Sequence, residues 1–106
     1  MNEKINDLVC SLTTAELRDR RDTVLRQIRN QVLETSELPN GYSFRFSGAD
    51  EIVDMVAEFI KTERMCCQFF AFSLDVKGDK SGSSMTLTGP EGVKNFIRDE
   101  LGLGSF

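Results

Sequence analysis

The segment YSFRF, residues 42–46, alternates between aromatic and polar side chains. Successive residues of a β-strand point to opposite faces. Tyr42, Phe44 and Phe46 therefore share one face, and Ser43 and Arg45 share the other. The preceding residues 38–41, LPNG, have the composition of a turn. Together these features predict a half-buried strand whose aromatic face belongs to the core.

Helices are predicted on both sides of this strand. Before it, Thr13 and Glu16 form a capping box, and apolar residues at helical spacing continue the pattern to about residue 34. After it, a second helix is expected over residues 49–67. The rest of the chain predicts strands at 70–76 and 84–88, a Gly/Ser-rich loop between them, and a last helix that begins near Pro90 and is stopped by Gly102.

The expected order of elements is therefore α-β-α-β-β-α, in a single α+β domain over residues 1–106. A strand–helix–strand connection crosses over right-handedly, so the first two strands are expected to be parallel and the third antiparallel. This arrangement is a small three-stranded mixed sheet with helices covering one face. Because the edges of such a sheet are open to pairing, a homodimer is also expected.

Composition narrows the classes of function. The chain has 106 residues, of which 40% are hydrophobic and 28% charged, with a net charge of −4 and no histidine. The negative net charge argues against a nucleic-acid partner, because proteins bind nucleic acids largely through attraction between basic side chains and the phosphates. The sequence has no apolar run of the roughly 18 residues that span a bilayer, and its first ten residues are too polar for a signal peptide. We therefore expect a cytoplasmic protein with reduced thiols and no membrane partner.

The second predicted helix carries a carboxylate on its inward face. At about 100° per residue, Glu63 falls within about 60° of Val56, Ile60 and Cys67. A carboxylate that is buried without a partner destabilises the fold by roughly several kcal/mol, or its pKa rises and it takes up a proton. Arg21 lies on the inward stripe of the first helix and is the candidate partner. The alternative is that both side chains extend past the edge of the core into solvent.

Cys66 and Cys67 follow directly and allow two interpretations. Buried cysteines often serve only as small apolar residues of the core. Thiolates are also soft ligands for Zn(II), Cu(I) or a heavier thiophilic ion such as Hg(II). Cys10, Cys66 and Cys67, with Glu63 as a fourth ligand, form the candidate metal site. Cys10 can reach the pair only if the first two helices pack antiparallel with a suitable offset.

A third interpretation is an enzyme in which a cysteine is the nucleophile and Glu63 shuttles a proton. The two cysteines lie at the C-terminal end of their helix, where the macrodipole disfavours a thiolate. The absence of histidine also removes the standard cysteine-hydrolase arrangement. Binding is therefore favoured over catalysis, and no catalytic residue is predicted.

Three segments resemble a little-characterised bacterial family of about this length: residues 10–13 (CSLT), 63–70 (ERMCCQFF) and 87–92 (LTGPEG). The sharpest shared motif is E-x-x-C-C-x-F. Similar segments follow the DNA-binding part of some MerR-type heavy-metal regulators. The resemblance implies sensing or handling of heavy metals by Cys66 and Cys67, with Cys10 and Glu63 carried over as further positions. It departs at Gln68, where Pro or Ala is expected, and no helix-turn-helix is predicted within these residues.

The sequence thus favours a small domain that binds a thiophilic metal ion or a small thiol-reactive ligand through its cysteines, as a sensor, carrier or buffer. A dimeric interaction module with core cysteines and a cysteine-dependent enzyme are the alternatives.

Overall fold

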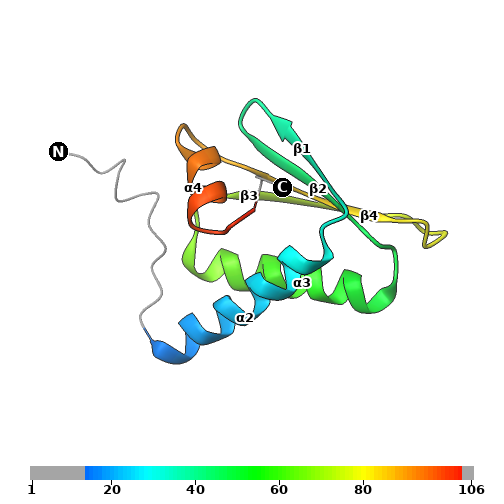
Figure 1. The fold of residues 1–106 in the computed structure, drawn as a ribbon, viewed down its shortest axis with the longest axis horizontal. Coiled ribbons are helices and arrows are strands. Elements are labelled where there is room, and N and C mark those ends of the chain that lie inside the picture. Colours follow the sequence, from blue (N-terminus) through cyan, green and yellow to red (C-terminus); the bar gives the residue numbers. More distant parts are fainter. Residues whose placement is uncertain (1–13, 104–106) are drawn as a thin grey trace.

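The computed structural model describes residues 14–103, apart from the side chain of Cys66, and has the expected α+β class. Its elements are α2 (Ala15–Gln31), β1 (Glu34–Leu38), β2 (Gly41–Phe46), α3 (Asp50–Cys66), β3 (Ala71–Val76), β4 (Ser83–Thr88) and α4 (Val93–Asp99). The three helices lie on one face of the sheet, with α2 and α3 side by side and α4 near the end of β4 (Figure 1).

The sheet has four strands in the order β1-β2-β4-β3, and every hydrogen-bonded pair is antiparallel. The prediction of a three-stranded mixed sheet is therefore wrong in both strand number and pairing. Strands β2 and β3 do run in the same direction, but β4 lies between them. Met85 of β4 faces Phe44 on one side and Leu74 on the other.

The strand missing from the prediction is β1. The first helix ends at Gln31 instead of near residue 34, and the Leu33 amide already donates to the Arg45 carbonyl at 2.8 Å. The β1 sequence ETSEL is polar on both faces, so it lacks the apolar alternation that marks a half-buried strand. The predicted turn is confirmed, because it joins β1 to β2. A side chain on Gly41 would place its Cβ 1.8 Å from the Leu87 carbonyl oxygen, so this position requires glycine.

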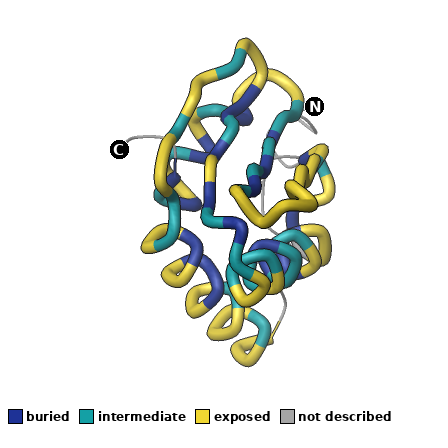
Figure 2. The backbone as a smooth tube through the Cα atoms, turned by 90° about the vertical axis from the view of Figure 1, so that its right-hand side faces the viewer, coloured by how far each residue is buried: buried dark blue, intermediate teal, exposed yellow. Residues whose placement is uncertain are grey.

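The core lies between the helices and the inner face of the sheet. The aromatic face predicted for β2 is confirmed, since Tyr42, Phe44 and Phe46 are all buried. Buried positions on the two long helices turn toward the sheet, and their exposed turns face outward (Figure 2). The other buried apolar residues are Val24, Leu25, Ile28, Val56, Phe59, Cys67, Phe70, Met85, Leu87, Val93, Phe96, Ile97, Leu101 and Leu103.

The helix ends follow the expected chemistry with small shifts. The Leu17 amide donates to the Thr14 hydroxyl at 3.2 Å, so Thr14 caps α2. The cap predicted at Thr13 lies outside the described residues. Pro90 stands in the turn before α4, where the Val93 amide donates to its carbonyl at 3.0 Å. Gly102 has a φ of 67° and follows the helix, as predicted.

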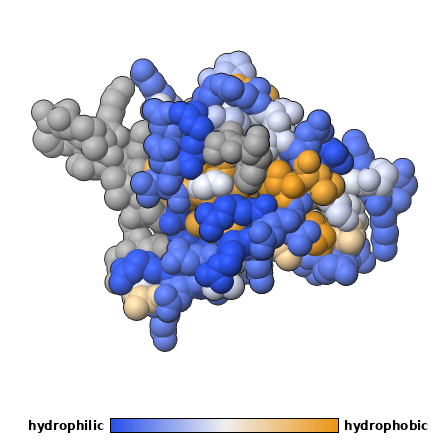
Figure 3. Space-filling view, viewed as in Figure 1, coloured by the Kyte–Doolittle hydropathy of each residue, from blue (hydrophilic) through white to orange (hydrophobic). Residues whose placement is uncertain are grey.

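The opposite face of the sheet is covered by no described helix. It carries short polar side chains, among them Ser43, Ser73, Ser84 and Thr86. The surface seen from the side of Figure 1 is mostly polar, with apolar side chains gathered where the sheet meets the helices (Figure 3). Within residues 14–103, no helix has the length and apolar character needed to cross a membrane.

Candidate functional site

The paired cysteines lie where α3 ends and the chain turns toward β3. Cys66 is the last residue of α3, and Cys67 is the C-cap, whose amide donates to the Glu63 carbonyl at 2.7 Å. The Phe70 amide then bonds to the Cys67 carbonyl at 3.4 Å, which closes the turn. This geometry buries Cys67 completely. Of the four predicted ligands, Cys10 lies outside the described residues, and the side chain of Cys66 is not described.

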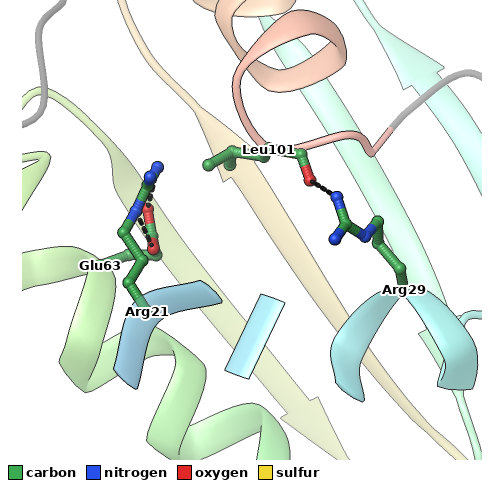
Figure 4. A network of polar contacts seen from close by, with 4 residues as sticks. All are labelled: Arg21, Arg29, Glu63 and Leu101. Carbon is green, nitrogen blue, oxygen red and sulfur yellow. Dashed lines mark hydrogen bonds and ion pairs between the residues drawn. The ribbon is translucent and has the colours of Figure 1, made fainter. Parts of the chain in front are cut away.

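Glu63 is paired with Arg21, as the helical pattern predicts (Figure 4). The Arg21 Nε donates to Glu63 Oε2 at 2.9 Å, and an Nη donates to Oε1 at 3.5 Å. The side chains are 13% and 1% exposed, so the pair sits inside the contact between α2 and α3. The alternative in which both side chains extend into solvent is wrong. The two-point contact is the strong form of an arginine–carboxylate interaction.

Burial dominates the electrostatics of this site. Loss of solvent raises the pKa of Glu63 above its ordinary value, and the positive charge of Arg21 only partly offsets this effect. Burial also raises the pKa of the Cys67 thiol to about 12. The negative charge of Glu63, which interacts with this thiol, adds to the increase, and Arg21 opposes it. Cys67 is therefore a protonated thiol at neutral pH.

A pocket of about 630 Å³ opens beside Cys67. Its lining comes from the end of α3 and the start of β3: Ile60, Arg64, Cys67, Gln68, Phe70 and Phe72. Arg64 and Gln68 supply polar groups to the lining, and Ile60, Phe70 and Phe72 supply apolar ones. A small ligand in this pocket would lie against the turn that holds the two cysteines.

The described side chains, which do not include those of Cys10 and Cys66, show no cluster of metal ligands. Among them, no group of three or more cysteine, aspartate or glutamate side chains is placed to hold a metal ion. Cys67 and Glu63 are brought together, but both carboxylate oxygens of Glu63 face Arg21. Cys10 and Cys66 would have to complete the predicted set of ligands.

Two arginines of α2 make structural contacts, and the sequence pattern predicts only one of them. Arg21 is identified by its position on the inward stripe. Arg29 lies near the end of α2, and its guanidinium donates to the Leu101 carbonyl at 3.3 Å (Figure 4). No local signal could have found this contact, because Leu101 lies 72 residues further along the chain.

Comparison of the chain with protein-family models, with curated proteins and with solved structures found no match.

Proposed function

We propose that this domain binds a thiophilic metal ion or a small thiol-reactive ligand through Cys66 and Cys67, as a sensor, carrier or buffer. The observation that carries the proposal is the pocket beside Cys67, which gives a ligand a place next to the paired cysteines. Cys10 is the candidate third thiol. Glu63 is the least available of the predicted ligands, because Arg21 binds both of its oxygens.

The chemistry of the site suits a soft ion better than a hard one. A thiol with a pKa of about 12 stays protonated at neutral pH, so an ion must displace the proton to bind. Ions with a strong preference for sulfur, such as Hg(II) and Cu(I), supply that driving force. Carboxylate-seeking ions such as Mg(II) find only Glu63, which is already paired. The resemblance to heavy-metal regulators favours the same class of ligand.

The alternative in which the cysteines are core residues rests on the complete burial of Cys67. The enzyme alternative is weakened by the same site. With a pKa of about 12, roughly one Cys67 in 10⁵ carries a thiolate at pH 7, and the thiolate is the nucleophilic form.

The binding proposal is tested by native mass spectrometry after addition of one equivalent of Hg(II), Cu(I) or Zn(II). We expect stoichiometric retention of at least one ion by the unmodified chain. Retention should be lost in Cys66→Ser and in Cys67→Ser, with circular dichroism confirming the fold. Cys10→Ser reports whether a third thiol contributes. Met65→Leu is the matched control: it removes an exposed sulfur next to the pair and should leave retention unchanged.

Titration of the native chain with Ellman's reagent separates the alternatives. If no thiol reacts before denaturant is added and no ion is retained, the cysteines are core residues and the binding proposal is wrong. Rapid modification of a single thiol at neutral pH, without retention of any metal, would instead favour the enzyme.

A further inference from the structure

Strand β3 forms the edge of the sheet opposite β1, and the helices leave its inner face partly uncovered (Figure 1). Leu74 and Val76 are 37% and 45% exposed. Their partners on β4, Met85 and Ser83, are only 0% and 4% exposed. The core-facing side of the sheet therefore continues beyond the helix layer as an exposed apolar strip.

The flank of α3 extends this strip. Val53, Ala57 and Ile60 fall within about 60° of one another on the helix, and all three are half-buried. Ile60 lines the same pocket as Phe72 of β3, so this flank lies on the β3 side. We call the combined surface the β3 wall, and its members are Val53, Ala57, Ile60, Phe72, Leu74 and Val76.

The two edges of the sheet differ in how well they are protected against pairing. Strand β1 carries Glu34 and Glu37, and Glu37 on its inner face is bound by Lys94. Charges of this kind commonly block edge-to-edge association. Strand β3 has no proline or lysine, and its single charge, Asp75, lies on the outer face. Among residues 14–103, nothing pairs with the outer edge of β3, and this edge can accept another strand.

We propose that a second copy of this chain docks on the β3 wall, with the two β3 strands paired antiparallel in one continuous eight-stranded sheet. A two-fold axis makes such an interface self-complementary, because each strand presents the same residues to the other. The proposal is independent of the proposed metal binding.

Charge selects the register of the two strands. With Ser73 opposite Ser73 of the second copy, Leu74 faces Phe72 and Val76 faces Phe70, so each exposed apolar residue meets an aromatic ring. The two Asp75 carboxylates are then four residues apart along the strands, about 13 Å. Centring the pairing on Leu74 would instead bring these carboxylates to diagonal positions, where like charges repel.

The charges of α3 favour the same arrangement. Two-fold pairing of β3 would place the two α3 helices on the same side of the sheet in antiparallel orientation. On the flank of α3 that belongs to the wall, Asp50 lies at the N-terminal end and Arg64 at the C-terminal end. Antiparallel helices therefore orient the acidic end of this flank in one copy toward the basic end in the other.

The dimer would also complete the pocket beside Cys67. Phe70 and Phe72 line that pocket, and in this register they face Val76 and Leu74 of the second copy. A six-residue strand is about 20 Å long, and one sheet layer plus one helix layer is roughly 20 Å deep. The resulting area of about 400 Å² per chain, or roughly 800 Å² in total, lies below the roughly 1,200 Å² at which stable interfaces begin, in the range of weak and transient contacts. We therefore expect a reversible dimer.

The first test is sedimentation equilibrium between 5 and about 500 µM. The unmodified chain should show a reversible monomer–dimer equilibrium. Leu74→Lys should raise the dissociation constant at least tenfold, because it puts a charge in the wall. The matched control is Leu33→Lys, which changes an equally apolar, 58% exposed residue before β1 and should leave the equilibrium unchanged. A chain that stays monomeric throughout, or a Leu74→Lys variant that dimerises normally, overturns the proposal.

The second test fixes the register, in a background of Cys10→Ser and Cys66→Ser. Ser73→Cys should form a disulfide-linked dimer under mild oxidation, because directly opposed strand residues have Cα atoms within the range of a disulfide. Asp75→Cys should form at least tenfold less, since its counterpart lies about 13 Å away. Equal or inverted yields would contradict the proposed pairing.

Discussion

In the Arg21–Glu63 pair, the charge of one side chain offsets the cost of burying the other. The Glu63 carboxylate is almost fully buried, and its pKa is raised because solvent has been removed from it. Without the guanidinium, the charged form of Glu63 would lose the strongest interaction that compensates for its burial. The pair therefore joins α2 to α3 at the base of the turn that holds the cysteines.

Breaking this pair from either side should destabilise the fold. We expect Arg21→Met and Glu63→Gln each to lower the free energy of unfolding by about 2–3 kcal/mol, because each leaves a buried polar group without its partner. The double variant should lose less than the sum of the two. Urea denaturation at pH 7 gives the free energy of unfolding of the unmodified chain, the two single variants and the double variant. Strict additivity would mean that the two side chains do not interact.

Cys67 should make stability depend on alkaline pH. Its pKa is about 12 in the folded chain, against an ordinary value of 9.0. Between these values the unfolded chain loses the proton while the folded chain keeps it, so the stabilising contribution is complete below pH 9 and is lost as pH rises. At pH 10.5 the loss should be about 2 kcal/mol.

Cys67→Ala removes this titration. The difference in free energy of unfolding between the unmodified chain and the variant, measured at pH 8 and pH 10.5, isolates Cys67 from the lysines and tyrosine that both chains share. A difference that stays constant with pH would show that the thiol is not held in its protonated form.

At the scale of elements, the β1–β2 hairpin depends on one glycine. The Cβ of an alanine at position 41 would overlap the Leu87 carbonyl, so β2 and β4 would have to separate locally. Gly41→Ala should therefore lower the thermal midpoint by several degrees, corresponding to about 1–3 kcal/mol. Gly78→Ala is the matched control, because nothing lies within 4 Å of its added Cβ. Similar midpoints for the two variants would contradict this account of the hairpin.

The two strands of this hairpin differ in how well the sequence predicts them. The aromatic face of β2 is predicted correctly, because the alternation of aromatic and polar residues along the strand matches the buried and exposed faces of the sheet. Strand β1 is missed because an edge strand of polar residues is held by its pairing with β2 and has no periodicity of its own.

At the scale of the whole molecule, the order of strands predicts where the backbone is most protected. In the part of the chain that the structure describes, strands β2 and β4 are paired on both sides, whereas β1 and β3 are paired on one. Hydrogen exchange measured by mass spectrometry at low protein concentration should therefore be slowest in β2 and β4. Raising the concentration should slow exchange in β3 and leave β1 unchanged, if the second copy binds as proposed. Equal protection of all four strands would contradict this arrangement.

The sequence predicts one part of the candidate site, and the other part depends on the tertiary structure. Helical spacing alone brings Arg21 and Glu63 to facing stripes, and the structure confirms that pair. The burial of Cys67 and the pocket beside it depend on how α3, the following turn and β3 meet, which no local pattern encodes. The convergence of Cys10 with the paired cysteines stays a prediction.

By itself, the sequence determined the class of the fold, the aromatic face of β2 and the inward carboxylate of α3, because each follows from the period of side chains along one helix or strand. Only the tertiary structure decided that β4 lies between β2 and β3, that β1 joins the sheet, and that β3 is an edge strand among the described residues. Strand order depends on contacts between segments far apart in the chain, and many orders satisfy the same pattern of apolar residues.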